Sequence, residues 1–472
     1  MRRLCRAGLM ILISVTVSFP LFGQTNFFTK TIDPVVSFNG GKRVIVPESY
    51  LTFSLDQNGL ERFLKGATVA DELLFNRSAA PVLELPMPDS TISKFRIWES
   101  SIMEPGLAAK FPSIKTFTGQ GIDDPTATIK IDLTELGFHA MVLSDVKGSV
   151  FIDPFQQLNT SDYIVYYKKD FKQKDLFVEQ GVIPSRQSPG KNAARPPAGP
   201  CLGAELRTYR LAVACTGEYA RAATGLTNPT VSQTLAAIVT SVNRVDGIYE
   251  KELAISFNLV ANNNLIVFTN PGSDQFTAND DGEALLDESQ SVIDANIGTA
   301  NYDIGHTFST GGGGIAELEC VCSNTKARGV TGLAQPVGDP YDIDYVAHEI
   351  GHQFGASHTF NAVTSSCSGN RSSETAVEPG GGITIMAYAG ICGATNDLAQ
   401  NSIPYFHGVS MDEISVFVTS GNGAICPVKT PTGNAPPVVN AGSNHTIPKS
   451  TYFFLTGSGS DPDNDALTFS WE

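Results

Sequence analysis

The sequence predicts a central α/β domain flanked by two β-rich regions. Three observations support this fold class. Residues 25 to about 185 contain short strand-like runs, strand-like and helix-like segments alternate between 206 and 427, and strand-like runs return after residue 438. Strands that alternate with helices indicate an α/β layer structure. The length of 472 residues is consistent with about three domains.

The chain begins with features of a secretory signal peptide. Residues 1–23 carry three arginines, then the largely apolar run Leu9–Leu21, then the small Gly23. This apolar run is too short for a spanning helix. No later stretch approaches 18 uninterrupted apolar residues, so we expect a secreted, soluble protein without a membrane span.

The overall charge excludes one class of function. A formal net charge of −16 argues against nucleic-acid binding, which requires a basic face. The apolar content of 42% is sufficient for sizeable cores.

Residues 24–185 are predicted to be mostly β, with strands at Thr128–Leu133, Gly148–Pro154 and Tyr163–Tyr167. They contain no catalytic constellation, and the lone His139 is expected to be packed rather than functional. The following residues 186–205 include a polar, basic stretch rich in Pro and Gly. We expect an exposed linker there that is open to proteolytic nicking.

The central domain, residues 206–427, shows both periodicities. Its expected helices carry apolar residues on one face, and Ser410–Glu413 has the pattern of a capping box before a helix that Gly421 ends. The expected strands are Leu206–Ala214, Ile255–Phe268 and Tyr302–Phe308, and the expected longer helices are Thr230–Lys251 and Gly282–Ile297.

The most informative stretch of this domain reads H-E-x-x-H-x-x-G-x-x-H. On a helix, His348 and His352 lie one turn apart on the same face, so both imidazoles can bind one metal ion. Gly355 can end the helix in a left-handed conformation, which lets His358 become a third ligand. Three imidazoles and a water form a tetrahedral zinc site with an open position, and Glu349 is placed to take a proton from that water.

The last part of the chain has a different composition. Residues 428–437 form a Pro-rich linker, and residues 438–472 contain expected strands at Val438–Val439, Tyr452–Leu455 and Leu467–Phe469. Asp461–Asp465 offers oxygen ligands for Ca²⁺, and an acidic turn is an equally good interpretation. This unit resembles the opening of an immunoglobulin-like β-sandwich of the polycystic-kidney-disease type. The β-sandwich is incomplete, which suggests a fragment of a longer protein.

The histidine motif resembles that of the metzincins, zinc endopeptidases with a methionine turn under the metal. Met386, in Ile383–Tyr388, is the candidate for that turn. Residues 206–427 are most similar to bacterial reprolysin-like (adamalysin-related) proteases. One difference is Thr359, because adamalysins usually have Asp after the third histidine.

The resemblance implies a twisted mixed sheet with an active-site helix, and a secreted zinc endopeptidase made as a zymogen. Phe95–Pro154 resembles the propeptides of the same proteases, so residues 24–185 are expected to be a propeptide; an accessory β domain that stays attached is the alternative. Gly314–Leu318 would be the edge strand above the cleft, where an extended peptide pairs antiparallel.

Tyr388 follows Met386 by two residues. In astacin-, serralysin- and pappalysin-like metzincins a tyrosine at that place helps bind the transition state, whereas adamalysins usually have Pro. A tyrosine packed under the helix is an equally good interpretation.

Seven cysteines remain after signal removal, and export favours disulfides. Cys322–Cys426 resembles a reprolysin bridge, Cys367–Cys392 would staple the cleft floor, and Cys215–Cys320 would complete three bridges. This connectivity is one choice among many.

The remaining thiol, Cys201, has two interpretations. It lies at the junction before the first catalytic strand, where a thiolate could bind zinc and keep a zymogen latent. A disulfide to Cys215 or Cys426 is the alternative.

Three functions are therefore open. The leading one is a monomeric zinc endopeptidase acting on proteins or peptides. The others are an adhesion or binding protein on the same scaffold, and a zinc hydrolase of non-peptide substrates.

Overall fold

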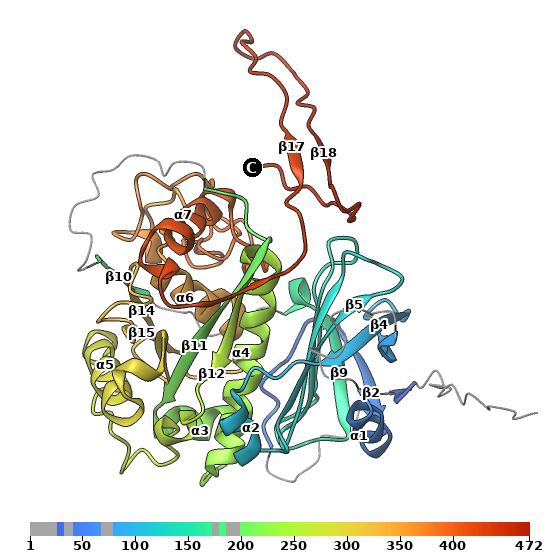
Figure 1. Ribbon diagram of the computed structural model, residues 1–472, viewed down its shortest axis with the longest axis vertical. Helices are drawn as coiled ribbons and strands as arrows, with labels where there is room; N and C mark the ends of the chain where they lie inside the picture. The colour runs from blue at the N-terminus through green and yellow to red at the C-terminus, as the bar shows by residue number, and fades with distance from the viewer. Residues whose placement is uncertain (1–25, 33–40, 68–78, 172–178, 186–198) are drawn as a thin grey trace, which may run out of the picture.

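The computed structural model describes residues 26–32, 41–67, 79–171, 179–185 and 199–472. The predicted signal peptide and most of the predicted linker 186–205 lie outside these ranges. Figure 1 shows an N-terminal sheet packed beside a central α/β domain, with a C-terminal hairpin extending away from both. Within the described residues, no helix combines the length and apolarity needed to cross a bilayer.

The N-terminal sheet has nine strands, and every neighbouring pair is antiparallel. Its order is β1-β2-β9-β8-β7-β6-β5-β4-β3, and the strands predicted at β6, β8 and β9 are confirmed. Two short helices, α1 (Gln57–Lys65) and α2 (Pro105–Lys110), accompany it. The strands are β1 Phe28–Thr31, β2 Leu51–Leu55, β3 Val82–Pro86, β4 Ile92–Glu99, β5 Lys115–Gly121, β6 Thr128–Thr134, β7 Gly137–Leu143, β8 Val150–Pro154 and β9 Asp162–Tyr167.

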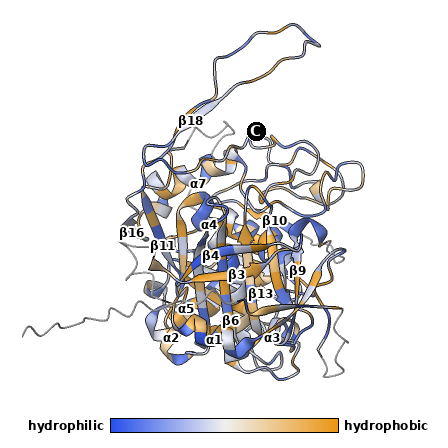
Figure 2. Cartoon of the chain, turned by 90° about the vertical axis from the view of Figure 1, so that its right-hand side faces the viewer, coloured by the Kyte–Doolittle hydropathy of each residue, from blue (hydrophilic) through white to orange (hydrophobic). Residues whose placement is uncertain are grey.

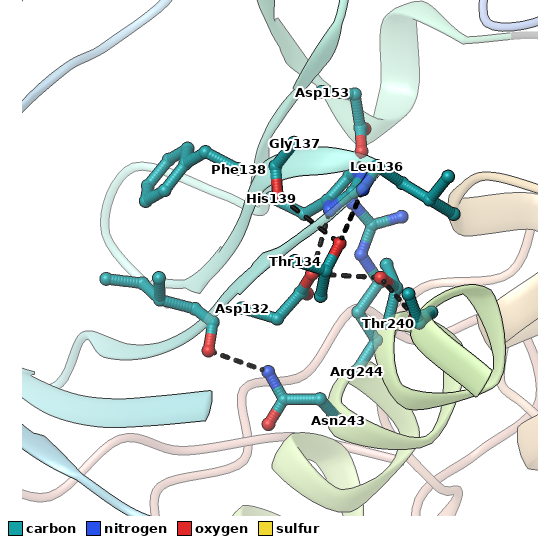
Figure 3. A network of polar contacts seen from close by, with 12 residues as sticks. Asp132, Thr134, Leu136, Gly137, Phe138, His139, Asp153, Thr240, Asn243 and Arg244 are labelled. Atoms are coloured by element: carbon teal, nitrogen blue, oxygen red, sulfur yellow. Dashed lines mark hydrogen bonds and ion pairs between the residues drawn. The ribbon is translucent and has the colours of Figure 1, made fainter. Parts of the chain in front are cut away.

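Both faces of this sheet are buried. Because side chains alternate along a strand, Ile152 joins the core that covers α1, whereas its neighbour Phe151 joins the core of the central domain. That second face lies against helix α4 (Val231–Leu253). Figure 3 shows the polar part of this contact, where Asp132 accepts hydrogen bonds from His139 (2.8 Å) and Thr240 of α4 (2.9 Å). His139 therefore has a structural partner.

The central sheet is mixed, with the order β10-β14-β15-β13-β11-β12, and β16 pairs with β11. The prediction that β14 forms the edge of this sheet is wrong, because β10 lies outside β14 and pairs with β14 in parallel. The predicted linker 428–437 also contains a strand, because β16 pairs with the start of β11. The strands are β10 Glu179–Ile183, β11 Glu205–Cys215, β12 Ile255–Leu259, β13 Ile304–Ser309, β14 Gly314–Glu317, β15 Gly329–Gly332 and β16 Val428–Pro431.

Helices cover both faces of this sheet (Figure 1). The predicted helices at α4 and α5 are confirmed, and Thr230 forms a capping box with Gln233 at the start of α4. The capping box predicted at Ser410 is wrong, because α7 already begins at Gly408 with His407 as its N-cap. The predicted strand Ile255–Phe268 ends at Leu259 and is followed by a 3₁₀ turn. The other helices are α3 Gly217–Thr224, α5 Gly282–Ile297, the π-helical turn η6 Pro340–Val346, α6 Ala347–Gln353 and α7 Gly408–Ser420.

The C-terminal residues form one antiparallel pair, β17 (Val438–Asn440) with β18 (Ser458–Ser460). The strands predicted at Tyr452–Leu455 and Leu467–Phe469 are absent from the described residues. A two-stranded ribbon has no second sheet to cover apolar side chains, so these segments remain exposed. Figure 2 shows this ribbon standing clear of the two larger sheets.

The acidic segment Asp461–Asp465, a candidate calcium site by sequence, forms an Asx-type turn. Asp461 accepts hydrogen bonds from the backbone N–H groups of Asp463 and Asp465, at 2.8 and 3.1 Å. The structure therefore favours the acidic-turn interpretation over a calcium site.

Buried ion pairs join the N-terminal sheet to the central domain. Arg244 of α4 contacts Asp153 of β8 and, at 3.0 Å, Asp342 of η6. Lys168, directly after β9, contacts Asp339 at 3.1 Å and Asp344 at 2.8 Å, both also in the segment that leads into α6. These side chains are all buried, so each cation compensates carboxylates that are otherwise costly to bury.

We expect Lys168→Met to destabilise the protein by about 3 kcal/mol, because it leaves two buried carboxylates without their cation. Lys115→Met is the matched control. Lys115 pairs with Glu99 at the surface, so its loss should cost under about 1 kcal/mol. Urea unfolding of the full chain measures both, and equal effects would contradict the prediction.

Candidate metal centre

Helix α6 places two of the three motif histidines. It is buried along its whole length, and the Nε2 atoms of His348 and His352 lie 3.0 Å apart on one face. Gly355 follows with a φ of +93°, the left-handed conformation expected for it. A Cβ at Gly355 would also lie 2.9 Å from the Glu319 side chain. The turn brings Nε2 of His358 to 3.1 Å from Nε2 of His352.

Backbone carbonyls hold each imidazole from behind. The Nδ1 atoms of His348, His352 and His358 lie 2.6–2.7 Å from carbonyl oxygens of three different segments. A carbonyl only accepts, so each Nδ1 carries the hydrogen and each Nε2 presents a lone pair. Burial lowers the pKa of His352 to about 4, which keeps this ring neutral. The accepting carbonyls are those of Ile385, Ala356 and Asn370.

The three Nε2 lone pairs therefore converge on one point. Acceptors that face one another at about 3 Å repel unless a cation lies between them. Neutral imidazoles with their other nitrogen hydrogen-bonded are the usual ligands of Zn²⁺. The donor set of these described residues therefore fits zinc.

Glu349 is completely buried beside the first histidine. Among the described residues, neither of its carboxylate oxygens has a hydrogen-bond partner. Burial, together with the nearby charge of Glu179, raises its pKa well above the usual range. A carboxylate with a raised pKa and free oxygens can accept a proton from a water in the site.

The predicted methionine turn lies directly under α6. Met386 is fully buried, and a Cβ on Gly351 would lie only 2.5 Å from its sulfur. Glu378, which the sequence analysis missed, holds this turn. It accepts hydrogen bonds from Thr359 (2.6 Å) and from the backbone N–H of Ile383 (2.7 Å). Thr359, the position where adamalysins have Asp, thus ties the third-histidine segment to the turn.

Tyr388 lies against the histidines. Its ring centroid is 4.7 Å from that of His358 and 5.8 Å from that of His348. The ring also packs on Phe360 at 4.3 Å. Burial and nearby carboxylates raise the pKa of its hydroxyl well above the usual range, so it remains a proton donor. Both interpretations of Tyr388 remain open.

A fourth group, which the sequence analysis missed, meets the three histidines. The carboxylate of Glu179 lies 3.1 Å from Nε2 of His348, 3.4 Å from that of His352 and 3.0 Å from that of His358. The side chain of Glu179 is completely buried at this point. It precedes His358 by 179 residues and belongs to no motif, so no sequence signal marks it.

The cysteines agree in part with the predicted bridges. Cys322–Cys426 and Cys367–Cys392 are confirmed. The Cys215–Cys320 bridge is wrong, because both thiols are free and buried in different surroundings. Cys215 contacts the carbonyl of Phe268, whereas Cys320 contacts that of Arg328.

Cys201 is a free, exposed thiol. The disulfide proposed for it is also wrong, since Cys426 is bonded to Cys322 and Cys215 is unpaired. The group of possible metal ligands in the described residues contains Glu179 and the three histidines, and not Cys201.

These features together define a metzincin-type metallopeptidase domain. They are a mixed sheet beside a buried helix, three histidines on and after that helix, and a methionine turn beneath them. Residues 205–416 match the model of the reprolysin-like metallopeptidase family M12B, whose members use zinc. This match supports a reprolysin-like metzincin for that part of the chain. No curated protein matches the chain.

We expect one zinc per chain in the purified protein and a loss of most of it in His358→Ala, because two imidazoles hold the metal far more weakly than three. His445→Ala is the control, since His445 is exposed and lies outside the group of possible ligands. Elemental analysis after dialysis measures the content. Full occupancy in His358→Ala would remove His358 from the ligand set.

Proposed function

We propose that this chain is a zinc-dependent endopeptidase that is exported as a zymogen and hydrolyses peptide bonds with a water activated by Glu349. One observation carries the proposal: three Nε2 lone pairs converge beside a buried carboxylate whose oxygens have no partner among the described residues. When bound there, zinc supplies Lewis-acid polarisation of the water and of the scissile carbonyl.

The protein groups divide the remaining work. Glu349 accepts the proton of the attacking water and then delivers it to the leaving amine, for which its raised pKa is suited. The buried hydroxyl of Tyr388 is proposed to donate a hydrogen bond to the oxyanion that develops on the carbonyl carbon's oxygen. His348, His352 and His358 are proposed to hold the metal.

Strand β14 supports a peptide substrate over a non-peptide one. An extended segment, β10, already pairs with it beside the histidines. Backbone pairing of this kind is a general mode of peptide recognition. The adhesion alternative is less well supported, because a binding protein would have no need for the buried Glu349, whose oxygens lack a hydrogen-bond partner among the described residues.

Two further observations support export and a pro-segment. The disulfides Cys322–Cys426 and Cys367–Cys392 are typical of proteins in oxidising compartments. The N-terminal sheet, which precedes the matched domain, packs on α4 and is proposed to be the folded propeptide.

We expect Glu349→Ala to lower casein hydrolysis by about 10²–10⁴-fold while zinc content is unchanged, because the general base is lost. The full chain is assayed after limited trypsin treatment, with and without a chelator. Glu283→Ala removes an exposed carboxylate from α5 and should retain activity. Chelator-insensitive hydrolysis, or full activity of Glu349→Ala, would overturn the proposed function.

We expect Tyr388→Phe to lower turnover by about tenfold or more with little change in KM, because the lost hydrogen bond acts on the transition state. Phe360→Leu, which alters only the packing of the ring, controls for structural effects. If Tyr388→Phe has normal turnover and a full complement of zinc, its role is packing.

A further inference from the structure

The strand that carries Glu179, β10, adds to the edge of the central sheet by backbone pairing, as a bound peptide would. β10 pairs in parallel with β14, from Glu179 opposite Gly314 to Ile183 opposite Glu317 (Figure 1). Beyond it, Leu318 donates a backbone hydrogen bond to Ile183 (3.0 Å). The ladder is interrupted by an irregularity between Glu179 and Gly181, where Gly181 has a φ of +108°. A glycine allows this bend, which turns the strand at the histidines.

The bend delivers a side-chain carboxylate to the three imidazoles. Glu179 is buried, and its oxygens lie 3.0–3.4 Å from all three Nε2 atoms. Because the rings donate from Nδ1 to backbone carbonyls, Glu179 faces lone pairs rather than N–H groups. A buried anion in that position requires a cation at the same point. Three imidazoles and one carboxylate are a complete tetrahedral set for Zn²⁺.

A complete set changes the chemistry of the site. Catalytic zinc sites keep one position open for water, whereas sites with four protein ligands are closed. A carboxylate in the open position leaves Glu349 without a water to deprotonate. The group presented is also a side chain, which contains no peptide bond for the site to hydrolyse.

We propose that Glu179 is the fourth metal ligand of the precursor and keeps it latent by occupying the position of the reactive water. This rests on the proposed function. Strand β10 directly precedes the expected cleavage region 186–205, so a cut there separates it from the domain at one end. Once the strand leaves β14, the same edge and the same metal position become available to a substrate.

Glu179 and Cys201 are competing candidates for one position. Cys201 is exposed and outside the group of possible ligands, whereas Glu179 is buried within it. A direct comparison of the two residues therefore decides which of them blocks the site.

The experiment measures access to the metal rather than catalysis. Full-length precursor carrying Glu349→Ala, so that it cannot digest itself, is loaded with Co²⁺, and acetohydroxamate binding is followed by the visible absorption of the metal. We expect Glu179→Ala to bind the probe at least about tenfold more tightly than the parent, because the position no longer has to be vacated. Glu179→Gln, whose side chain has nearly the same size, should also bind acetohydroxamate more tightly than the parent. This variant controls for a disturbance of β10 by Ala.

Two further variants complete the comparison. Cys201→Ser and the surface control Glu283→Ala should bind the probe as the parent does. Unchanged affinity in both Glu179 variants would overturn the inference, as would tighter binding in Cys201→Ser alone. Casein hydrolysis by the trypsin-treated protein is measured independently of probe binding. Tighter probe binding without Glu349-dependent hydrolysis would support Glu179 as a metal ligand and would contradict only the proposed peptidase activity.

Discussion

The site depends on three hydrogen bonds between imidazole Nδ1 atoms and backbone carbonyls. They fix which nitrogen of His348, His352 and His358 carries the hydrogen, and so direct three lone pairs to one point. The accepting carbonyls belong to the methionine turn, the turn after α6 and the segment that contains Asn370. A metal at that point therefore organises three loops that contain little regular structure of their own.

The N-terminal sheet contributes to the same arrangement from the other side. Lys168 and Arg244 neutralise Asp342 and Asp344 in the π-helical turn that leads directly into α6, and Asp339 at its N-cap. Phe151 of β8 and Ile164 and Tyr166 of β9 share one continuous core with α4. The sheet thus supports the start of α6. Strand β10, which also precedes the central domain in the chain, contacts the histidines through Glu179. A propeptide with these contacts would assist folding and block the site through separate elements.

Sequence patterns gave correct predictions where the structure depends only on residues that are close in the chain. The H-E-x-x-H spacing sets two side chains one turn apart whatever surrounds the helix, and a glycine at the left-handed position requires no knowledge of the fold. Alternation identified β6, whose apolar Ile129 and Ile131 join one core, whereas strand-forming residues identified β9 and the bounding glycine and turn identified β8. Resemblance predicts the Cys322–Cys426 pair, whereas Cys215–Cys320 is only the pair left over, and these two free thiols are buried in different surroundings.

The sequence by itself determined the grouping of the three histidines and the adjacent acid Glu349, because a helix and one glycine turn relate these residues; Met386 was added by the resemblance to the metzincins. Only the tertiary structure decided which other residues contact the histidines and support the segments that carry them. Glu179 and the buried cation Lys168 come from segments distant in the chain, and their positions depend on strand pairing and packing that no short-range pattern encodes. The exposed runs after residue 450 show the converse: strand-like composition forms no strand there, because no second sheet covers it.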